Sequence, residues 1–112
     1  MTGRGLEAED TALRFLEAKG LRLVQRNYRC RFGEIDLIMR DSDGLVFVEV
    51  RMRSSGAFGG ASESITAGKR ARLLAAARHF IGAQRDIPAC RFDAVLLDGD
   101  TRVDWVQNAF GE

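Results

Sequence analysis

The stretch that decides the fold is residues 33–53, which read GEIDLIMRDSDGLVFVEVRMR. Two apolar runs rich in Ile, Leu and Val, residues 34–40 and 45–52, have the composition of buried β-strands. Between them stands DSDG, residues 41–44, whose residue types favour a tight turn. This stretch therefore predicts two neighbouring strands joined by a short turn.

The sequence on either side extends the sheet and adds two helices. Apolar residues recur at helical spacing before Gly20, and again in the segment that Thr66 is placed to cap. Residues 53–64 are rich in Gly and Ser, which indicates a loop, and Pro88 ends a later linker. In chain order, the predicted elements are a helix over 5–19, strands over 21–30, 34–40 and 45–52, a helix that begins at Thr66, and strands over 91–97 and 103–106.

The element order α-β-β-β-α-β(-β) predicts an α/β fold with a mixed sheet flanked by helices. Strands 45–52 and 91–97 are joined through a helix, so we expect them to be parallel and adjacent. With 112 residues, the chain has room for a single domain, 1–112. Its 46% apolar and 29% charged residues exclude a disordered chain. No apolar run approaches the roughly 18 residues of a membrane span, and without an apolar leader the expected compartment is the cytoplasm.

Basic residues are unevenly distributed along the chain. Residues 1–85 carry 15 basic and 10 acidic side chains, a net of +5, whereas residues 86–112 carry 2 and 6, a net of −4. A surface that binds phosphate should therefore come from the first part. Fifteen of the 17 basic residues are Arg, whose planar guanidinium suits phosphate, although a codon bias toward Arg explains the same excess. Cys30 and Cys90 stand far apart without a CxxC pattern, so we expect reduced thiols.

Three acidic residues occupy positions where a globular protein normally places apolar side chains. Glu9 falls on the buried stripe of the first helix. Asp36 interrupts an apolar strand, and Glu49 shares a face of the next strand with Arg51. Regular alternation along the first of these strands would put Ile35, Leu37 and Met39 on one face, and Glu34, Asp36 and Ile38 on the other.

The short turn should bring Asp36 and Glu49 close together on adjacent strands. Two carboxylates that share a pocket repel each other unless one is protonated or a cation lies between them. Oxygen ligands without a His cluster favour Mg²⁺ or Mn²⁺ over zinc. Under the alternative interpretation, the two carboxylates form solvated ion pairs with Arg29, Arg51 or Arg53. Spacing by itself leaves both interpretations open.

The motif formed by residues 27–38, NYRCRFGEIDLI, and residues 46–53, VFVEVRMR, resembles the uncharacterised YraN-like family. That family is similar to the Holliday-junction-resolvase branch of the restriction-endonuclease-like nucleases, whose PD-(D/E)xK signature is an Asp followed by Glu-x-Lys. Agreement extends to residues 9–12, Lys69, and the segments 91–93 and 108–110. The fold implied by this resemblance is a restriction-endonuclease-like three-layer α/β/α sandwich.

The resemblance implies a divalent-metal-dependent endonuclease that hydrolyses phosphodiester bonds in structured or branched DNA. Asp36 and Glu49 would then bind Mg²⁺ or Mn²⁺, and Glu9 would support the metal or orient a water. Arg51 stands where the signature has Lys. Because Arg stays protonated, it can stabilise negative charge on a phosphate but cannot serve as a general base. Two alternatives remain: a catalytically weak or inactive nucleic-acid-binding protein on the nuclease fold, and an adaptor with a vestigial acidic pocket.

Several other residues carry weaker expectations. Glu34 is expected to brace the neighbouring turn or pair with an Arg rather than bind metal. His79 is expected to be a packed or surface residue rather than a ligand. The expected contacts to nucleic acid are made by Arg29, Arg53, Lys69 and Arg70, although a solvated helix face explains the last two equally well. A junction offers two strands to cut, so a homodimer is expected by analogy.

Overall fold

The computed structural model describes residues 3–53, 66–83, 89–98 and 102–110 of the chain. Its elements follow the predicted order and are α1 (Gly3–Ala18), β1 (Arg22–Cys30), β2 (Gly33–Arg40), β3 (Leu45–Arg53), α2 (Ala67–Gly82), β4 (Cys90–Asp98) and β5 (Arg102–Phe110). The last strand is longer than the predicted segment 103–106. Residues 54–64 of the predicted loop and the linker residue Pro88 lie outside the described residues.

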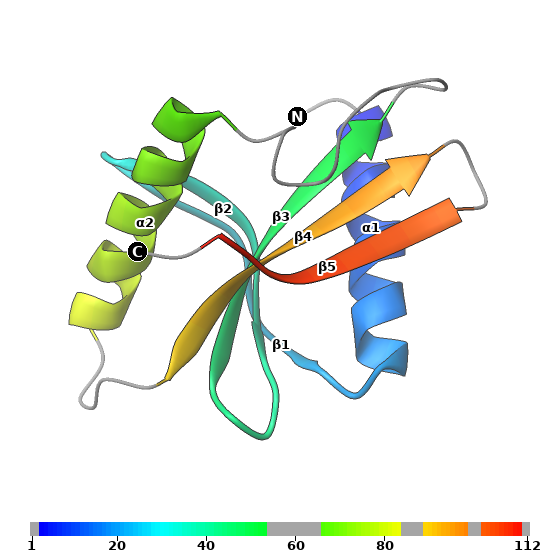
Figure 1. Ribbon diagram of the computed structural model, residues 1–112, viewed down its shortest axis with the longest axis horizontal. Helices are drawn as coiled ribbons and strands as arrows, with labels where there is room; N and C mark the ends of the chain where they lie inside the picture. Colours follow the sequence, from blue (N-terminus) through cyan, green and yellow to red (C-terminus); the bar gives the residue numbers. More distant parts are fainter. Residues whose placement is uncertain (1–2, 54–65, 84–88, 99–101, 111–112) are drawn as a thin grey trace.

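The strands form one mixed sheet in the order β1-β2-β3-β4-β5. The meander of β1, β2 and β3 is antiparallel, as its short connections require. β3 and β4 pair in parallel, which confirms the expectation for strands joined through a helix, and β5 returns antiparallel to β4. Helix α2 covers one face of this sheet and α1 the other, which gives the three layers of the α/β/α sandwich (Figure 1).

Each helix closes a separate apolar core against its face of the sheet. Leu73 and Phe80 of α2 pack on Phe47, whereas Leu16 of α1 packs on Val48. The predicted alternation along β3 is therefore confirmed, and it directs Glu49 toward α2. Neither helix in the described part of the chain is long and apolar enough to cross a bilayer.

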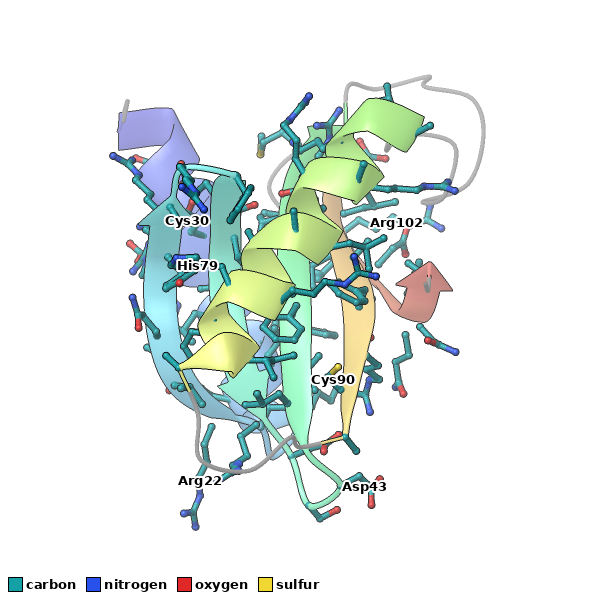
Figure 2. The ribbon with its side chains drawn as sticks, turned by 90° about the vertical axis from the view of Figure 1, so that its left-hand side faces the viewer. Arg22, Cys30, Asp43, His79, Cys90 and Arg102 are labelled. Atoms are coloured by element: carbon teal, nitrogen blue, oxygen red, sulfur yellow. The ribbon has the colours of Figure 1, made fainter. Side chains whose placement is uncertain are left out.

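The turn between β2 and β3 has the predicted chemistry. Asp41 Oδ1 accepts hydrogen bonds from the backbone N–H groups of Asp43 at 2.8 Å and Gly44 at 3.0 Å. At Gly44 a Cβ atom would lie 2.2 Å from the carbonyl oxygen of Ala89, so the close approach of the two backbones requires glycine. Figure 2 shows Asp43 at one end of the sheet and Cys30 at the other. The carboxyl end of β3 lies at the same end of the sheet as Cys30. At this end β2 and β3 no longer pair with each other.

Candidate functional site

β2 separates from β3 at Asp36. The ladder between these strands runs from Arg40↔Leu45 to Leu37↔Val48. One residue further, the Asp36 side chain replaces the backbone of β2 as partner, and its Oδ2 accepts the Val50 N–H at 2.9 Å. Beyond this point β2 continues beside β1, and β3 continues beside β4 (Figure 1). We call this divergence, with Asp36 at its base, the fork.

The regular alternation predicted for β2 is wrong at the fork. Ile35 packs under α2 together with Ile38, whereas Leu37 packs under α1. Across the ladder, Asn27 falls between the pairs Arg26↔Leu37 and Tyr28↔Ile35. Asn27 has a φ of 55°, in the left-handed region, and such a residue disrupts the pleat locally. Both strands therefore change face at this level, and Asp36 can approach groups on either side of the sheet.

Four acidic residues from three elements meet at the fork. One carboxylate oxygen from each of Glu9, Glu34 and Asp36 lies within 4.8 Å of the others. Glu49, from β3, forms a hydrogen bond with Asp36. Glu9 and Glu49 are only 5% and 4% exposed. The structure thus brings together the three acids singled out from the sequence and adds Glu34, which also pairs with Arg29 at 3.2 Å as expected.

The fork changes the acidity of its central carboxyl group. Burial is the largest cause of a shift that raises the pKa of Asp36 from 3.8 to about 8. The hydrogen bond to Glu49 and the charges of Glu49 and Glu9 raise this pKa further, while the Val50 N–H acts in the opposite direction. At neutral pH the acids therefore carry less negative charge than their number suggests, because one of them retains a proton.

Basic side chains approach the fork from β1 and α2. Arg26 Nε lies 3.3 Å from Glu9 Oε1, and Nη1 of the same guanidinium lies 2.7 Å from Asp10 Oδ1. Lys69 Nζ lies 2.6 Å from Glu49 Oε2. This oxygen is buried and has no aligned hydrogen bond within the described residues, so the contact is an ion pair by distance alone. Solvated arginine pairs therefore do not describe Glu49.

The remaining candidate residues lie around this centre rather than in it. Arg51 is half-buried on β3, and none of the described residues forms an ion pair with it. Arg70 is half-buried beside Lys69, and the side chain of Arg53 lies outside what the structure describes. His79 is exposed and hydrogen-bonds through Nδ1 with the Tyr28 hydroxyl, as expected of a surface residue.

Sequence reasoning placed Lys69 on an open helix surface or a DNA backbone, and missed its contact with Glu49. The Thr66 cap was recognised, and Thr66 Oγ1 accepts the Lys69 N–H at 3.1 Å, which fixes the first turn of α2. A further signal was available in composition: Lys69 and Lys19 are the two lysines in a chain with 15 arginines. A lysine is rare in this chain, and its rarity could have singled out Lys69 as a candidate site residue.

The donor set at the fork fits a hard divalent cation. Two oxygens bound to one Mg²⁺ lie roughly 3 to 4 Å apart, since each Mg–O distance is about 2.1 Å. The observed grouping within 4.8 Å is close to this spacing. At this centre Asp36 retains its proton, and the buried Glu49 Oε2 has no aligned hydrogen bond within the described residues, although Lys69 Nζ lies 2.6 Å away. Oxygens of Glu9, Glu34 and Asp36 are therefore spaced to hold such an ion, whereas Glu49, expected from the sequence as a ligand, does not belong to this group.

Comparisons with known proteins support the resemblance drawn from the motif. Residues 8–97 match the model of the uncharacterised protein family UPF0102. A UPF0102 protein of Nitrosomonas europaea is 56% identical, with 97% of this chain and 94% of the relative covered. A UPF0102 protein of Dechloromonas aromatica is 59% identical, with 97% and 89% covered. The matched region contains the whole fork, and the chain belongs to the YraN-like family UPF0102.

Proposed function

We propose that this protein is a divalent-metal-dependent endonuclease that hydrolyses phosphodiester bonds in structured or branched DNA. The observation that carries the proposal is the fork, where acids from α1, β2 and β3 converge and Asp36 keeps a proton near neutral pH. Burying like charges together is unfavourable unless a cation compensates them, so such a pocket is suited to bind one. The choice of DNA as substrate rests on the resemblance to resolvase-type nucleases.

Asp36 and Glu49 would hold Mg²⁺ or Mn²⁺, supported by Glu9. When bound, the ion would supply Lewis-acid activation of water and would offset negative charge on the phosphodiester. Arg51, on the same strand as Glu49, would donate bidentately to the phosphate that is cleaved. Glu9, held by Arg26, would accept a hydrogen bond from the attacking water and so orient it.

Contacts to the DNA backbone would come from β1, the end of β3 and α2, through Arg29, Arg53, Lys69 and Arg70. Arg29 is the most accessible of these in the described structure, with a side chain 64% exposed. Contacts from basic side chains to phosphate carry no base information, so we expect recognition by DNA shape rather than sequence. Cutting both strands of a junction would require a second copy of the chain.

A second candidate is a nucleic-acid-binding protein without turnover. It is favoured by Arg51 at the position where the nuclease signature has Lys, because a guanidinium does not release a proton to or accept one from water at ordinary pH. The two candidates share the metal centre and the DNA surface, and they differ only in whether the bound strand is cut.

Asp36→Asn should weaken Mn²⁺ binding by at least about 10-fold, because it removes a charged ligand from the centre of the fork. Isothermal calorimetry of the full chain with MnCl₂ measures this directly. Asp43→Asn is the matched control, since Asp43 is an exposed acid in the turn at the opposite end of the sheet (Figure 2). Equal heats for the wild type and Asp36→Asn would show that the fork does not bind the ion.

The wild type should nick or cut branched DNA in the presence of Mn²⁺ and lose this activity in EDTA. The measurement is a gel assay on a panel of junctions, flaps and linear duplexes, with Asp36→Asn as the inactive comparison. Retardation of DNA at low salt without cleavage would favour the binding protein. If the wild type retards no nucleic acid at low salt, both DNA proposals fail and the adaptor remains.

A further inference from the structure

Lys69 is a residue of α2 that contacts an acid of the fork, Glu49. Its ammonium lies 2.6 Å from Glu49 Oε2, and the Lys69 side chain is 34% exposed while that of Glu49 is 4% exposed. The backbone of Lys69 is fixed by the Thr66 cap. A buried carboxylate and a partly accessible ammonium therefore meet at the edge of the site, with the cation on the side that solvent or a ligand can reach.

Within the part of the chain that the structure describes, the contact with Glu49 leaves further N–H donors of Lys69 available. An ammonium has three N–H donors on a compact point charge, and the contact with Oε2 occupies at most one of them. Hydrolysis of a phosphodiester joins the water oxygen to phosphorus, breaks the bond to one sugar oxygen, and transfers one water proton to that leaving oxygen. Negative charge grows on the non-bridging oxygens during this step, and hydrogen-bond donors aimed at these oxygens accelerate it.

Arg51 does not occupy the equivalent place. It stands at the lysine position of the nuclease signature but forms no ion pair with any of the described carboxylates, including those of the fork. Lys69, 18 residues later in the chain, does reach Glu49. The cation in direct contact with Glu49 is thus the ammonium of Lys69 from the helix rather than the guanidinium of Arg51 from the strand.

We propose that Lys69 supplies from α2 the ammonium that the signature would place at position 51. It donates hydrogen bonds to the non-bridging oxygens of the reacting phosphodiester while it keeps its proton. This assignment rests on the proposed nuclease function and makes Lys69 a catalytic residue. It also removes the main objection to turnover, because the site does contain a lysine.

Three variants test the assignment: Lys69→Met, the double variant Lys69→Met/Arg51→Lys, and the control Lys19→Met. Lys19 is the chain's other lysine and lies over the Phe15 ring near the end of α1. Lys69→Met should lower the single-turnover cleavage rate at saturating Mn²⁺ by about 100-fold or more, the typical loss when one transition-state donor is removed. The double variant should recover about 10-fold of this loss, and Lys19→Met should cleave like the wild type.

Calorimetry with MnCl₂ separates this role from a structural one without relying on cleavage. Removing an ammonium from Glu49 leaves a more negative pocket, so Lys69→Met should bind Mn²⁺ at least as tightly as the wild type. A Lys69→Met variant that cleaves at the wild-type rate overturns the assignment. So does one whose Mn²⁺ affinity falls in step with its rate, which is the behaviour of a structural prop.

The wild type alone reports on the underlying function. If it neither binds Mn²⁺ nor cleaves DNA, the nuclease proposal fails and the Lys69 assignment fails with it. If it binds Mn²⁺ but cleaves nothing, the metal centre stands and the role of Lys69 in turnover is excluded. If it cleaves and Lys69→Met cleaves equally well, only the Lys69 assignment is overturned.

Discussion

Asp36→Asn should make the protein more stable than the wild type at pH 8 when divalent ions are removed with EDTA. The pKa of Asp36 rises from 3.8 to about 8 on folding, because the carboxyl is buried and lies against Glu49 and Glu9. Between these two pH values the unfolded chain has lost a proton that the folded chain keeps. The stabilisation by this proton is complete below pH 3.8 and is lost as the pH rises through about 8.

The wild type should therefore lose stability across this window with a slope of up to about 1.4 kcal/mol per pH unit from this one group. Asn is neutral at every pH, so the variant should lack this component. Urea unfolding followed through the single tryptophan, Trp105, at several pH values gives both curves. Asp43→Asn should retain the wild-type slope. Parallel curves for the wild type and Asp36→Asn would mean that Asp36 is ionised throughout, and the electrostatic argument for the fork would fail.

Adding Mn²⁺ should change the pH dependence of the free energy of unfolding in the opposite direction. A metal ligand must be deprotonated, so binding displaces the proton of Asp36 and becomes more favourable as the pH rises. The gain in stability on adding Mn²⁺ should therefore be larger at pH 8 than at pH 5 in the wild type. In Asp36→Asn this difference between the two pH values should be much smaller.

Much of the fold could be predicted from the sequence because its signals are local. The Asp-rich turn at 41–44 and the apolar runs beside it define β2 and β3 within a few residues. The parallel pairing of β3 and β4 follows from a general rule about crossover connections. Glu9 and Glu49 could be found because periodicity assigns them to buried faces, and burial of a carboxylate is unusual.

The remaining features of the site depend on contacts that periodicity does not encode. A single left-handed residue, Asn27, accompanies a change of face on two strands, and strict alternation cannot anticipate it. Glu34 was expected to pair with an Arg rather than to join the acids, and in the structure it does both. The contact of Lys69 with Glu49 requires the placement of α2 over the sheet. Tertiary packing decides such contacts. The sequence between β3 and α2, residues 54–65, contains no local pattern that predicts how α2 packs on the sheet.

Asp93→Ala should lower the free energy of unfolding by about 3–5 kcal/mol, the usual cost of leaving a buried ionic partner uncompensated. Asp93 is fully buried and accepts hydrogen bonds from Arg91 Nε at 3.0 Å, Trp105 Nε1 at 2.9 Å and the Asn108 N–H at 2.9 Å. Its removal leaves these donors without an acceptor. Urea unfolding followed by circular dichroism measures the loss, since Trp105 itself is perturbed.

Asp93→Asn should fall between the wild type and Asp93→Ala, because the amide keeps an acceptor oxygen but does not balance the charge of Arg91. A loss below about 1 kcal/mol in Asp93→Ala would show that the hydrogen bonds of Asp93 to Trp105 and Asn108 contribute little to holding β5 on β4.

Asp36 and Asp93 form the same kind of hydrogen bond but have opposite effects on stability. Each carboxylate accepts an N–H from the next strand where the ladder is irregular: Asp36 from Val50, and Asp93 from Asn108, whose φ is 54° beside a register shift between β4 and β5. The neighbours of Asp93 are hydrogen-bond donors, so the charge of its carboxylate is compensated and β5 is held on β4. Around Asp36 burial and the neighbouring acids Glu49 and Glu9 disfavour the charged form, so the fold is more stable when the carboxyl is neutral. Replacement of the two residues should therefore change stability in opposite directions in one assay at pH 8. A chain retains such a destabilising acid where function requires it, which is why the fork rather than the Asp93 network is the place to look for chemistry.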